Sequence, residues 1–532
     1  DENGFAQTKD MPYGIYTVHQ VSGWEGSELM PDFDVFISQN EATYRYLINN
    51  APFNSFIKIV KQDAGTGKTI PYAGAGFKIY DPDGNPVTMT FTYPTSTNID
   101  VFYTDDEGSL ITPEKLPYGR GYSIVEVQAP YGYVLDETPI YFDVTQENSI
   151  EESGVTIIKV NKKNFAQKGT IAVEKTGEVF FGVSVSGGID ESGNELPIIY
   201  QPQYEKRGLP GAVYEIVAAE DIITPDGTVR NHKGDVVDTI ITDENGIAMS
   251  CELYLGEYEV REVTAPNGMV LNPESRFVEL VYAGQNVAVT ETATSFENER
   301  QKVEISLVKS IEQNERFDIG TNGEMKNITF GLFAAEEIVS ASGTSIPANG
   351  LIEIVSLNED GTATIKTDLP YGRYYVQEIA TDSHYKLSDA KYPIIFEYVG
   401  QDTAVVKIAV NDGKAIKNDL IYGSVSGKKV DEDGNALGGA MIGLFRTDDG
   451  EFTKENALMT TTSAEDGSFS FENIPCGTWY VREIEQPTGF VLDDTIYPVT
   501  IGTDGQVVEI EIVNEYGRGN IHLTKVDSEY PD

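Results

Sequence analysis

One phrase recurs along the chain and decides the interpretation of its fold: Arg261-Glu262-Val263-Thr264-Ala265-Pro266-Asn267-Gly268-Met269-Val270-Leu271. Two close copies are Val125-Glu126-Val127-Gln128-Ala129-Pro130-Tyr131-Gly132-Tyr133-Val134-Leu135 and Arg482-Glu483-Ile484-Glu485-Gln486-Pro487-Thr488-Gly489-Phe490-Val491-Leu492. A looser copy runs from Gln377-Glu378-Ile379 to Tyr385-Lys386-Leu387, and a degraded one begins at His19-Gln20-Val21. A phrase repeated at such intervals indicates tandem copies of one folding unit.

An aromatic residue precedes the acidic residue of each copy by four positions. These aromatics are Tyr122, Tyr258, Tyr374 and Trp479, with Tyr16 before Gln20 in the degraded copy. In a β-strand, positions i and i+4 lie on one face, so each Glu is expected to share the face of its aromatic neighbour. A carboxylate aimed into the core of a sheet needs a compensating partner.

Composition limits the classes of function that the chain supports. Its 532 residues include 38 Lys and Arg against 85 Asp and Glu, for a formal net charge of −47. This charge disfavours nucleic acid and anionic membranes as partners and favours a soluble, self-repelling chain. The sequence has no apolar run of membrane-spanning length and no heptad pattern. The two cysteines, Cys251 and Cys476, fall in different repeats and are not expected to pair.

The repeats predict the domain organisation. Whole repeats are expected at about 53–166, 167–300, 301–420 and 421–516, the second with an insertion at 178–206 and the third with a longer loop at 338–349. Residues 1–52 match the second half of a repeat and 517–532 the start of another, so we expect the sequence to begin and end inside repeats. Short strands, regular turns and no helical period predict an all-β fold: a tandem string of antiparallel β-sandwich domains.

A lysine in the first strand and an asparagine ending the last strand keep a fixed relation. The Asn that ends one repeat precedes the Lys of the next by eleven residues in Asn50/Lys61, Asn164/Lys175, Asn298/Lys309, Asn418/Lys429 and Asn514/Lys525. With the Glu of the recurring phrase, each whole repeat then contributes one Lys–Glu–Asn triad. The four triads are Lys61–Glu126–Asn164, Lys175–Glu262–Asn298, Lys309–Glu378–Asn418 and Lys429–Glu483–Asn514.

These residue types support one reaction when they are buried together. Burial lowers the pKa of a lysine and raises that of a glutamic acid, which gives a neutral amine beside a protonated acid. The amine is a nucleophile, and the acid can hydrogen-bond and polarise the Asn side-chain carbonyl. Attack, proton relay through the Glu and loss of ammonia would leave a Lys–Asn isopeptide bond, with no cofactor and no metal.

At these residues the sequence resembles a known family. The Glu-x-x-Ala-Pro-x-Gly-Tyr phrase, the terminal Asn and a Lys-x-Asp opening (Lys61-Gln62-Asp63, Lys429-Val430-Asp431, Lys525-Val526-Asp527) are similar to the B-type repeats of collagen-binding adhesins (Cna-B) and to the SpaA-like domains of sortase-assembled pilins. The resemblance implies transthyretin-like or inverse-immunoglobulin β-sandwiches with intramolecular Lys–Asn isopeptide bonds. It also implies a non-enzymatic stalk displayed on the cell wall of a Gram-positive bacterium.

Some positions leave alternatives open. Asn161 competes with Asn164, and Asn411 with Asn418; the eleven-residue spacing favours the second of each pair. The third repeat has Ala380-Thr381-Asp382-Ser383-His384 where the others have the Ala-Pro-x-Gly pattern or a close variant, and Gln20 cannot relay protons. In any repeat, the alternative to a covalent bond is a buried Lys–Glu salt bridge that is hydrogen-bonded to the Asn.

Other functions were weighed against this interpretation. A ligand-binding module would recognise a host glycoprotein, matrix protein or immunoglobulin through the 178–206 or 338–349 segments, and sortase-linked cell-wall or pilus neighbours are further partners. A glycosidase needs two exposed acids in a cleft, whereas these Glu residues are expected to be buried. The acidic runs 81–85 and 431–435 favour hairpin turns over calcium loops. His19, His232, His384 and His522 show no metal-ligand spacing.

Overall fold

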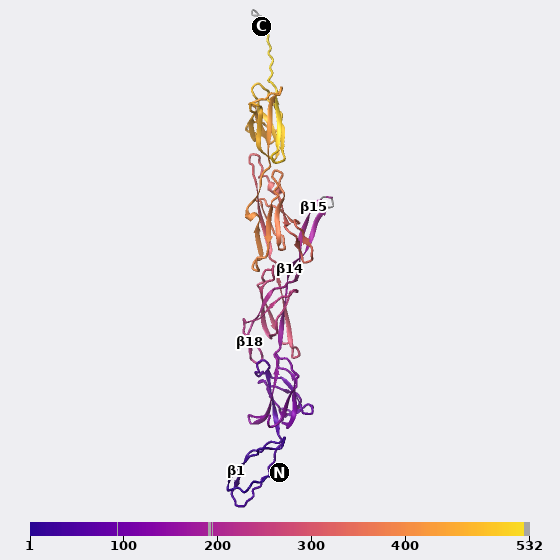
Figure 1. Cartoon of the computed structure of the whole chain (residues 1–532), viewed down its shortest axis with the longest axis vertical. Helices are drawn as coiled ribbons and strands as arrows, with labels where there is room; N and C mark the ends of the chain where they lie inside the picture. Colours follow the sequence, from indigo (N-terminus) through magenta and orange to yellow (C-terminus); the bar gives the residue numbers. More distant parts are fainter. Residues whose placement is uncertain (93, 190–192, 194, 526–532) are drawn as a thin grey trace. The chain divides into compact units, whose positions relative to one another are not determined.

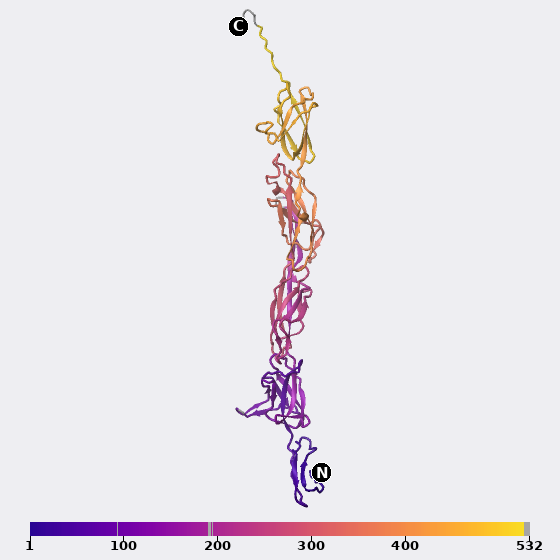
Figure 2. The same ribbon diagram turned by 90° about the vertical axis from the view of Figure 1, so that its left-hand side faces the viewer.

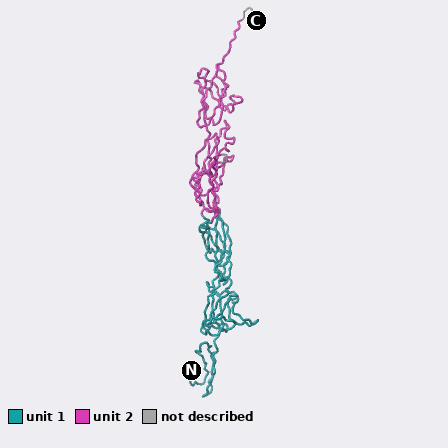
Figure 3. The backbone as a smooth tube through the Cα atoms, turned by 90° about the vertical axis from the view of Figure 1, so that its right-hand side faces the viewer, with its two compact units in different colours: residues 1–176, 208–266, 271–298 teal, residues 177–207, 267–270, 299–532 magenta. Residues whose placement is uncertain are grey.

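The structure, a computed structural model, describes residues 1–92, 94–189, 193 and 195–525. Two compact units divide the chain: residues 1–176, 208–266 and 271–298 form unit 1, and residues 177–207, 267–270 and 299–532 form unit 2 (Figure 3). Strands build both units, and the helices among the described residues are two short 3₁₀ turns, η1 (Glu324–Asn327) and η2 (Val410–Gly413). The all-β prediction is confirmed. No helix in the described part of the chain is long and apolar enough to cross a membrane.

Unit 1 begins with a small hairpin and contains the first sandwich. The hairpin pairs β1 (Gly14–Val18) with β2 (Phe33–Ile37), and the described residues 1–52 include none that is buried. The first sandwich stacks the sheet β12-β13-β3-β8, to which β9 is added, on the sheet β11-β10-β4-β7. Its strands are β3 (Asn54–Asp63), β4 (Gly76–Tyr80), β5 (Met89–Phe91), β6 (Thr97–Ile99), β7 (Phe102–Tyr103), β8 (Ser109–Ile111), β9 (Leu116–Pro117), β10 (Gly119–Gln128), β11 (Ile140–Val144), β12 (Ser149–Glu152) and β13 (Val155–Asn164).

The second sandwich, also in unit 1, repeats this plan. One sheet is β19-β16-β22-β23, and in the other the first part of β14 pairs with β20, β21 and β24. Its strands are β14 (Lys168–Ile189), β16 (Val213–Ala218), β17 (Ile222–Ile223), β18 (Val229–Asn231), β19 (Val236–Ile241), β20 (Ile247–Met249), β21 (Leu253–Tyr254), β22 (Gly256–Thr264), β23 (Arg276–Leu280) and β24 (Val289–Asn298). Figures 1 and 2 show the strands of each sandwich as two facing layers.

Unit 2 contains the third and fourth sandwiches. The third has the strands β25 (Lys302–Ile311), β26 (Thr329–Ala334), β27 (Ile338–Val339), β28 (Ser345–Ile346), β29 (Leu351–Ser356), β30 (Thr362–Ile365), β31 (Gly372–Ala380), β32 (Lys391–Phe396), β33 (Val405–Ala409) and β34 (Ile416–Asn418). The fourth has β35 (Tyr422–Asp431), β36 (Met441–Phe445), β37 (Met459–Thr462), β38 (Ser468–Pro475), β39 (Gly477–Glu485), β40 (Tyr497–Ile501) and β41 (Val507–Asn514). Residues 526–532, part of the repeat predicted to start at 517, lie outside the described residues.

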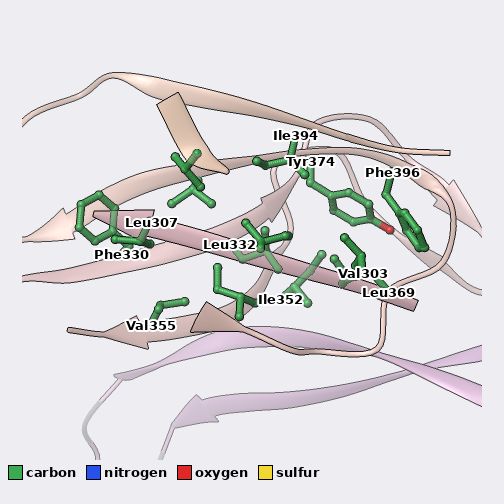
Figure 4. Packing of buried hydrophobic residues seen from close by; sticks show 14 of the residues in the cluster. Val303, Leu307, Phe330, Leu332, Ile352, Val355, Leu369, Tyr374, Ile394 and Phe396 are labelled. Atoms are coloured by element: carbon green, nitrogen blue, oxygen red, sulfur yellow. The ribbon is translucent and has the colours of Figure 1, made fainter. Parts of the chain in front are cut away.

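Alternating apolar residues from two facing sheets form each core. In the third sandwich, Leu307 of β25 and Leu332 of β26 point into the same space and are at most 2 % exposed (Figure 4). Period-2 alternation directs every second side chain of a strand inward, and burying such residues supplies most of the favourable free energy of folding. The inward positions of the first, late and last strands also carry the polar residues of the triads.

The predicted insertion 178–206 forms a hairpin that packs on the third sandwich. The second part of β14 and β15 (Glu195–Gly208) make this hairpin, and β15 pairs in parallel with β29 at Ile199 and Leu351 (Figure 1). On β14, the carbonyl groups of Phe180 and Phe181 accept the N–H groups of Ala341 and Ser342. The hairpin therefore belongs with the third sandwich, although its sequence lies in the predicted second repeat. Residues 190–192 and 194 of this insertion lie outside the described residues.

Candidate functional site

Each sandwich presents its Glu next to a β-bulge. In the first sandwich, Glu126 of β10 pairs with Phe77 of β4, and the register then skips one residue before Gln128. The same skip follows Glu262, Glu378 and Glu483 in their pairings with the facing strands. A bulge bends the strand locally and re-aims a side chain, and bulges are common beside functional sites. This repeated irregularity was not predicted from the sequence.

The aromatic residue four positions earlier is buried with the Glu, as predicted. Tyr122, Tyr258, Tyr374 and Trp479 are each at most 6 % exposed. Each also donates a hydrogen bond back to a main-chain carbonyl just before its strand, as Tyr258 does to Tyr254 at 2.6 Å and Trp479 to Pro475 at 2.8 Å. Because its polar atom is satisfied in this way, the ring can line the core beside the Glu at no hydrogen-bonding cost.

The Lys and the Asn come from neighbouring parallel strands of the opposite sheet. In the fourth sandwich, β35 and β41 run parallel and pair Lys429 with Ile512, which leaves Asn514 two residues further along the same face. The first and third sandwiches have the same relation, with Lys61 opposite Lys162 and Lys309 opposite Ile416. Diagonal neighbours on one face of a ladder are within reach of long side chains.

A glycine turn before the Glu strand contacts the backbone of the triad Lys in every sandwich. The N–H groups of Lys61, Lys175, Lys309 and Lys429 donate to the carbonyls of Gly108, Gly246, Gly361 and Gly467 at 2.7–2.9 Å. Gly467 has a φ of +79°, and a Cβ there would lie 2.4 Å from the carbonyl oxygen of Lys429. Both the left-handed backbone and the close approach favour glycine at this position.

The structure brings all four predicted triads together and buries them. No member is more than 6 % exposed. Lys Nζ lies 2.8 Å from the carboxylate of Glu126 and 2.9 Å from that of Glu262, and 3.5 and 3.6 Å from those of Glu378 and Glu483. In every triad Nζ also donates to the Oδ1 of the Asn: Lys61 to Asn164, Lys175 to Asn298, Lys309 to Asn418 and Lys429 to Asn514.

Burial sets the electrostatics of these sites. It lowers the pKa of Lys61 to about 8, although the attraction of Glu126 opposes the shift and the neighbouring Lys162 adds to it. Burial likewise lowers the pKa of Lys175, Lys309 and Lys429, and it raises the pKa of Glu483. Desolvation disfavours the charged form of either group, so proton transfer from the ammonium to the carboxylate becomes less costly than in water.

The carboxylate contacts the amide nitrogen of the Asn and not its oxygen. Asn Nδ2 donates to Glu126 at 2.7 Å, to Glu262 at 3.0 Å, to Glu378 at 2.6 Å and to Glu483 at 3.0 Å. We expected the Glu to hydrogen-bond the carbonyl, a position that the Lys ammonium occupies instead. The observed arrangement puts the Glu against the nitrogen that would leave and the Lys against the carbonyl that would be attacked.

A backbone N–H ten residues after the Glu anchors the carboxylate in three triads. Asp136 donates to Glu126 at 3.2 Å, Asn272 to Glu262 at 2.9 Å, and Asp493 to Glu483 at 2.8 Å. Met30 donates in the same way to Gln20 at 2.8 Å, so the degraded repeat keeps the anchor without the acid. The separation is ten residues in each case, but any residue type can supply a main-chain N–H. The sequence therefore gives no sign of this anchor.

The competing asparagines lie away from the triads. Asn161 is on the outer face of β13 and is exposed, because it is an odd number of residues from Asn164. Asn411 has a left-handed backbone (φ 55°) in η2, where its side chain donates to the carbonyl of Lys414 at 3.2 Å. The acidic runs at 81–85 and 431–435 form turns, in which Asp81 and Asp431 accept backbone N–H groups of the residues that follow.

An ionic cluster at the base of the hairpin ties the 178–206 segment to Arg300 and Asp368, and hydrogen bonds further along the hairpin tie it to the 338–349 segment. The Arg300 guanidinium stacks on Tyr204 at 3.3 Å, contacts both carboxylate oxygens of Asp368, and lies 3.3 Å from Glu178. The Arg300 side chain is 8 % exposed. Further along β14, the Val183 N–H donates to Thr344 Oγ1 at 3.1 Å. The 178–206 and 338–349 segments thus form part of one packed assembly in unit 2.

The fold gives the class of protein, and comparison with known proteins gives its family. The fold and the buried triads define a tandem β-sandwich protein. The chain matches the model of the SpaA prealbumin-like fold domain over residues 55–163, 198–294, 313–414 and 423–516, and it belongs to this family. This finding confirms the resemblance inferred from the recurring phrase. No curated protein matches the chain.

The solved structures to which the chain is similar include proteins from several bacteria. The Bacillus anthracis TIE protein has a TM-score of 0.46 and 16 % identity, over 87 % of this chain and 75 % of that one. BcpA, the major pilin subunit of Bacillus cereus, has a TM-score of 0.29 and 16 % identity, over 66 % and 100 %. The major pilin SpaD from Corynebacterium diphtheriae has a TM-score of 0.19 and 16 % identity, over 66 % and 98 %.

Proposed function

We propose that this chain is a structural stalk of an adhesin or pilus-like protein on the surface of a Gram-positive bacterium, and that its four triads form autocatalytic Lys–Asn isopeptide bonds. The observation that carries the proposal is the fourfold recurrence of a buried Lys, Glu and Asn in mutual contact. One buried ion pair is weak evidence for any role, since buried pairs also occur as structural features. Four buried triads whose members come from corresponding strands, each with a bulge after its Glu, support a shared chemical role.

The proposed reaction balances without a co-reactant. The Lys ammonium gives a proton to the Glu carboxylate, and the free amine attacks Cγ of the Asn as Nζ–Cγ forms. The Glu returns its proton to Nδ2 and takes one from Nζ as the Cγ–Nδ2 bond breaks. Ammonia leaves, and the isopeptide bond joins the first strand to the last. The chain would undergo this reaction once in each sandwich, so it is not an enzyme in the sense of turning over a substrate.

The bond would let a chain with two free cysteines, Cys251 and Cys476, resist force. The linked strands run side by side in parallel, so a pull on the two ends of a sandwich would load the covalent bond directly. Forced unfolding and proteolysis of a stalk depend on how often the sandwich opens, and a covalent bond between its first and last strands suppresses that opening. We further propose that the covalent units are 53–166, 167–300, 301–420 and 421–516, with anchoring to the cell wall outside them.

Peptide mapping tests the chemical part of this proposal. Digestion of the folded chain should release a branched peptide containing Lys175 joined to Asn298, with the mass of the two linear peptides less one ammonia. A Glu262→Gln chain should yield the two linear peptides, because a Gln keeps the shape of the Glu but cannot carry the proton. Recovery of linear peptides from both chains would refute bond formation in the second sandwich. The ligand-binding alternative gains no specific support, since its two candidate segments pack against each other.

A further inference from the structure

The third triad lacks one of the restraints that hold the other three. Glu378 Oε1 accepts the amide of Asn418 at 2.6 Å, but its Oε2 is buried and has no hydrogen-bond partner among the described residues. In the other triads a main-chain N–H ten residues on donates to the Glu. Oε2 lies 3.5 Å from Lys309 Nζ. Because it lacks the main-chain donor, the Glu378 carboxylate is held less firmly than its counterparts and by itself fixes the Asn418 amide less well.

A hydroxyl group supplies a second contact at this site. Asn418 Nδ2 donates to Thr381 Oγ1 at 3.0 Å as well as to Glu378. In the first sandwich the same nitrogen, Asn164 Nδ2, donates to the main-chain carbonyl of Val134 at 2.6 Å. Thr381 lies three residues after its Glu, a position held by Ala129 in the first repeat. The altered phrase of the third repeat thus introduces an oxygen acceptor where the first repeat has a methyl group.

We propose that Thr381 is a positioning residue for the third triad, whose hydroxyl holds the departing nitrogen of Asn418 beside Glu378 as the Val134 carbonyl does for Asn164. This inference rests on the proposed isopeptide chemistry. Two acceptors on the amide nitrogen hold the side-chain amide of Asn418 in one orientation. Its oxygen therefore stays toward Lys309, 2.5 Å from Nζ. Rotation of the amide would turn the nitrogen toward the amine and the oxygen toward the acid, and the attack geometry would be lost.

The test is the rate at which the Lys309–Asn418 bond forms in newly made protein. The full chain is produced by cell-free synthesis, sampled over time, quenched in acid and mapped by mass spectrometry. Thr381→Val keeps the shape of the side chain and removes the acceptor, whereas Thr381→Ser keeps the acceptor. We expect Val to slow this bond by about tenfold, the effect of losing one well-placed hydrogen bond, and Ser to remain within about twofold of the wild-type rate.

Internal controls separate this inference from the function on which it rests. The other three bonds form in the same molecules and should keep their rates in both variants, and Thr364→Val, an exposed change on β30, should leave all four rates unchanged. No third bond forms in a Glu378→Gln chain. Comparing the folding rate of that chain with and without Thr381→Val therefore measures the effect of the hydroxyl on folding alone. A wild-type chain with no crosslinks would refute the proposed function itself.

Three results would overturn the role of Thr381. The first is a Thr381→Val chain that forms the Lys309–Asn418 bond as fast as wild type. The second is equal slowing by Val and Ser, because a positioning role requires rescue by the conservative variant. The third is a wild-type chain that completes the other three bonds and leaves Lys309 free, since the hydroxyl would then fail to replace the missing restraint.

Discussion

Asn164 lies diagonally across a parallel ladder from Lys61, on the same inward face of the first sandwich. The ladder pairs Lys61 with Lys162 and Asp63 with Asn164, so the two side chains converge from adjacent strands. Glu126 reaches them from the facing sheet. A bond between these two residues would join the strand that enters the sandwich to the strand that leaves it, and the other three sandwiches place their Lys and Asn in contact in the same way.

The first prediction concerns the choice between two asparagines. Asn164→Ala should abolish the crosslink of Lys61, because Asn164 is buried in contact with it. Asn161→Ala should leave the crosslink intact, because Asn161 is exposed on the opposite face of β13. Peptide mapping of both variants decides the matter. A Lys61 crosslink that disappears with Asn161→Ala would show that the pairing of β13 with β3 is shifted during the reaction.

The second prediction separates the chemical from the structural role of Glu262. Glu262→Gln and Glu262→Ala should both leave Lys175 unreacted and without its counter-charge. Gln keeps a hydrogen-bond acceptor beside the amine and fills the core, whereas Ala removes both. The loss of the charge pair should cost Glu262→Ala roughly 3–5 kcal/mol beyond the loss of the covalent constraint. Trypsin cleavage of each variant at a series of urea concentrations measures its free energy of unfolding, and the difference between Ala and Gln separates the packing loss from the loss of the bond. If both variants resist trypsin as well as wild type does, Glu262 has neither role.

The third prediction is a pH profile for the first bond. The reactive pair Lys61–Glu126 holds one proton, which the Glu must deliver to the leaving nitrogen. Because the pKa of Lys61 is about 8, the pair loses this proton to solvent above that pH. The rate should therefore be level up to about pH 8 and then fall about tenfold per pH unit.

Refolding of unreacted chain at a series of pH values, with mapping of the Lys61–Asn164 peptide over time, measures this profile. Folding of the first sandwich, which lies between Trp24 and Trp479 and contains no tryptophan, is followed separately at each pH by pulsed proteolysis, so that slow folding is not mistaken for slow bond formation. A rate that keeps rising through pH 9 would mean that the free amine alone limits the reaction. The relay through Glu126 would then be wrong.

The fold and the triad members were accessible from sequence because they depend on local rules. The position of Glu262 four residues after Tyr258 fixes its face by strand alternation, and that face is buried. The spacing from Asn298 to Lys309 follows from a short connection between the last strand of one sandwich and the first of the next. These two spacings do not change when loops elsewhere in a repeat become longer or shorter, so they recur unchanged along the sequence.

Three features could not be predicted because they depend on the backbone or on distant contacts. The bulge after Glu126 and the Asp136 N–H that anchors its carboxylate involve main-chain atoms, which any residue supplies. The role of Thr381 depends on how the altered phrase folds back on Asn418. The hairpin at 178–206 was expected to belong to the second repeat, whereas its pairing with β29 is a long-range contact that leaves no periodic signal.

The fourth prediction concerns the ionic cluster at the base of that hairpin. Arg300→Met should weaken the packing of the hairpin on the third sandwich, because the buried guanidinium loses Asp368, Glu178 and Tyr204 together. Both acids are partly exposed, so we expect a modest effect of about 1–2 kcal/mol. Hydrogen exchange at the Ala341 and Ser342 amides, which bond to the hairpin, provides the readout.

Arg446→Met is the matched control for this change. Arg446 pairs with Asp318 at 3.3 Å in the same unit, but both side chains are largely exposed. Its loss should change the exchange of Ala341 and Ser342 by less than about 0.5 kcal/mol. Equal exchange in the Arg300→Met and wild-type chains would show that the strand pairing holds the hairpin without the cluster.

The most direct test of the central claim is the intact mass of the purified, folded chain. If every triad reacts, the chain should weigh less than its sequence by four molecules of ammonia, one for each Lys–Glu–Asn triad. Lys525 and Asn50 should stay unmodified, and a loss of three with Lys309 free would limit the reaction to the other sandwiches. A mass equal to that of the unmodified sequence would contradict the account and leave four buried salt bridges in place of four covalent bonds.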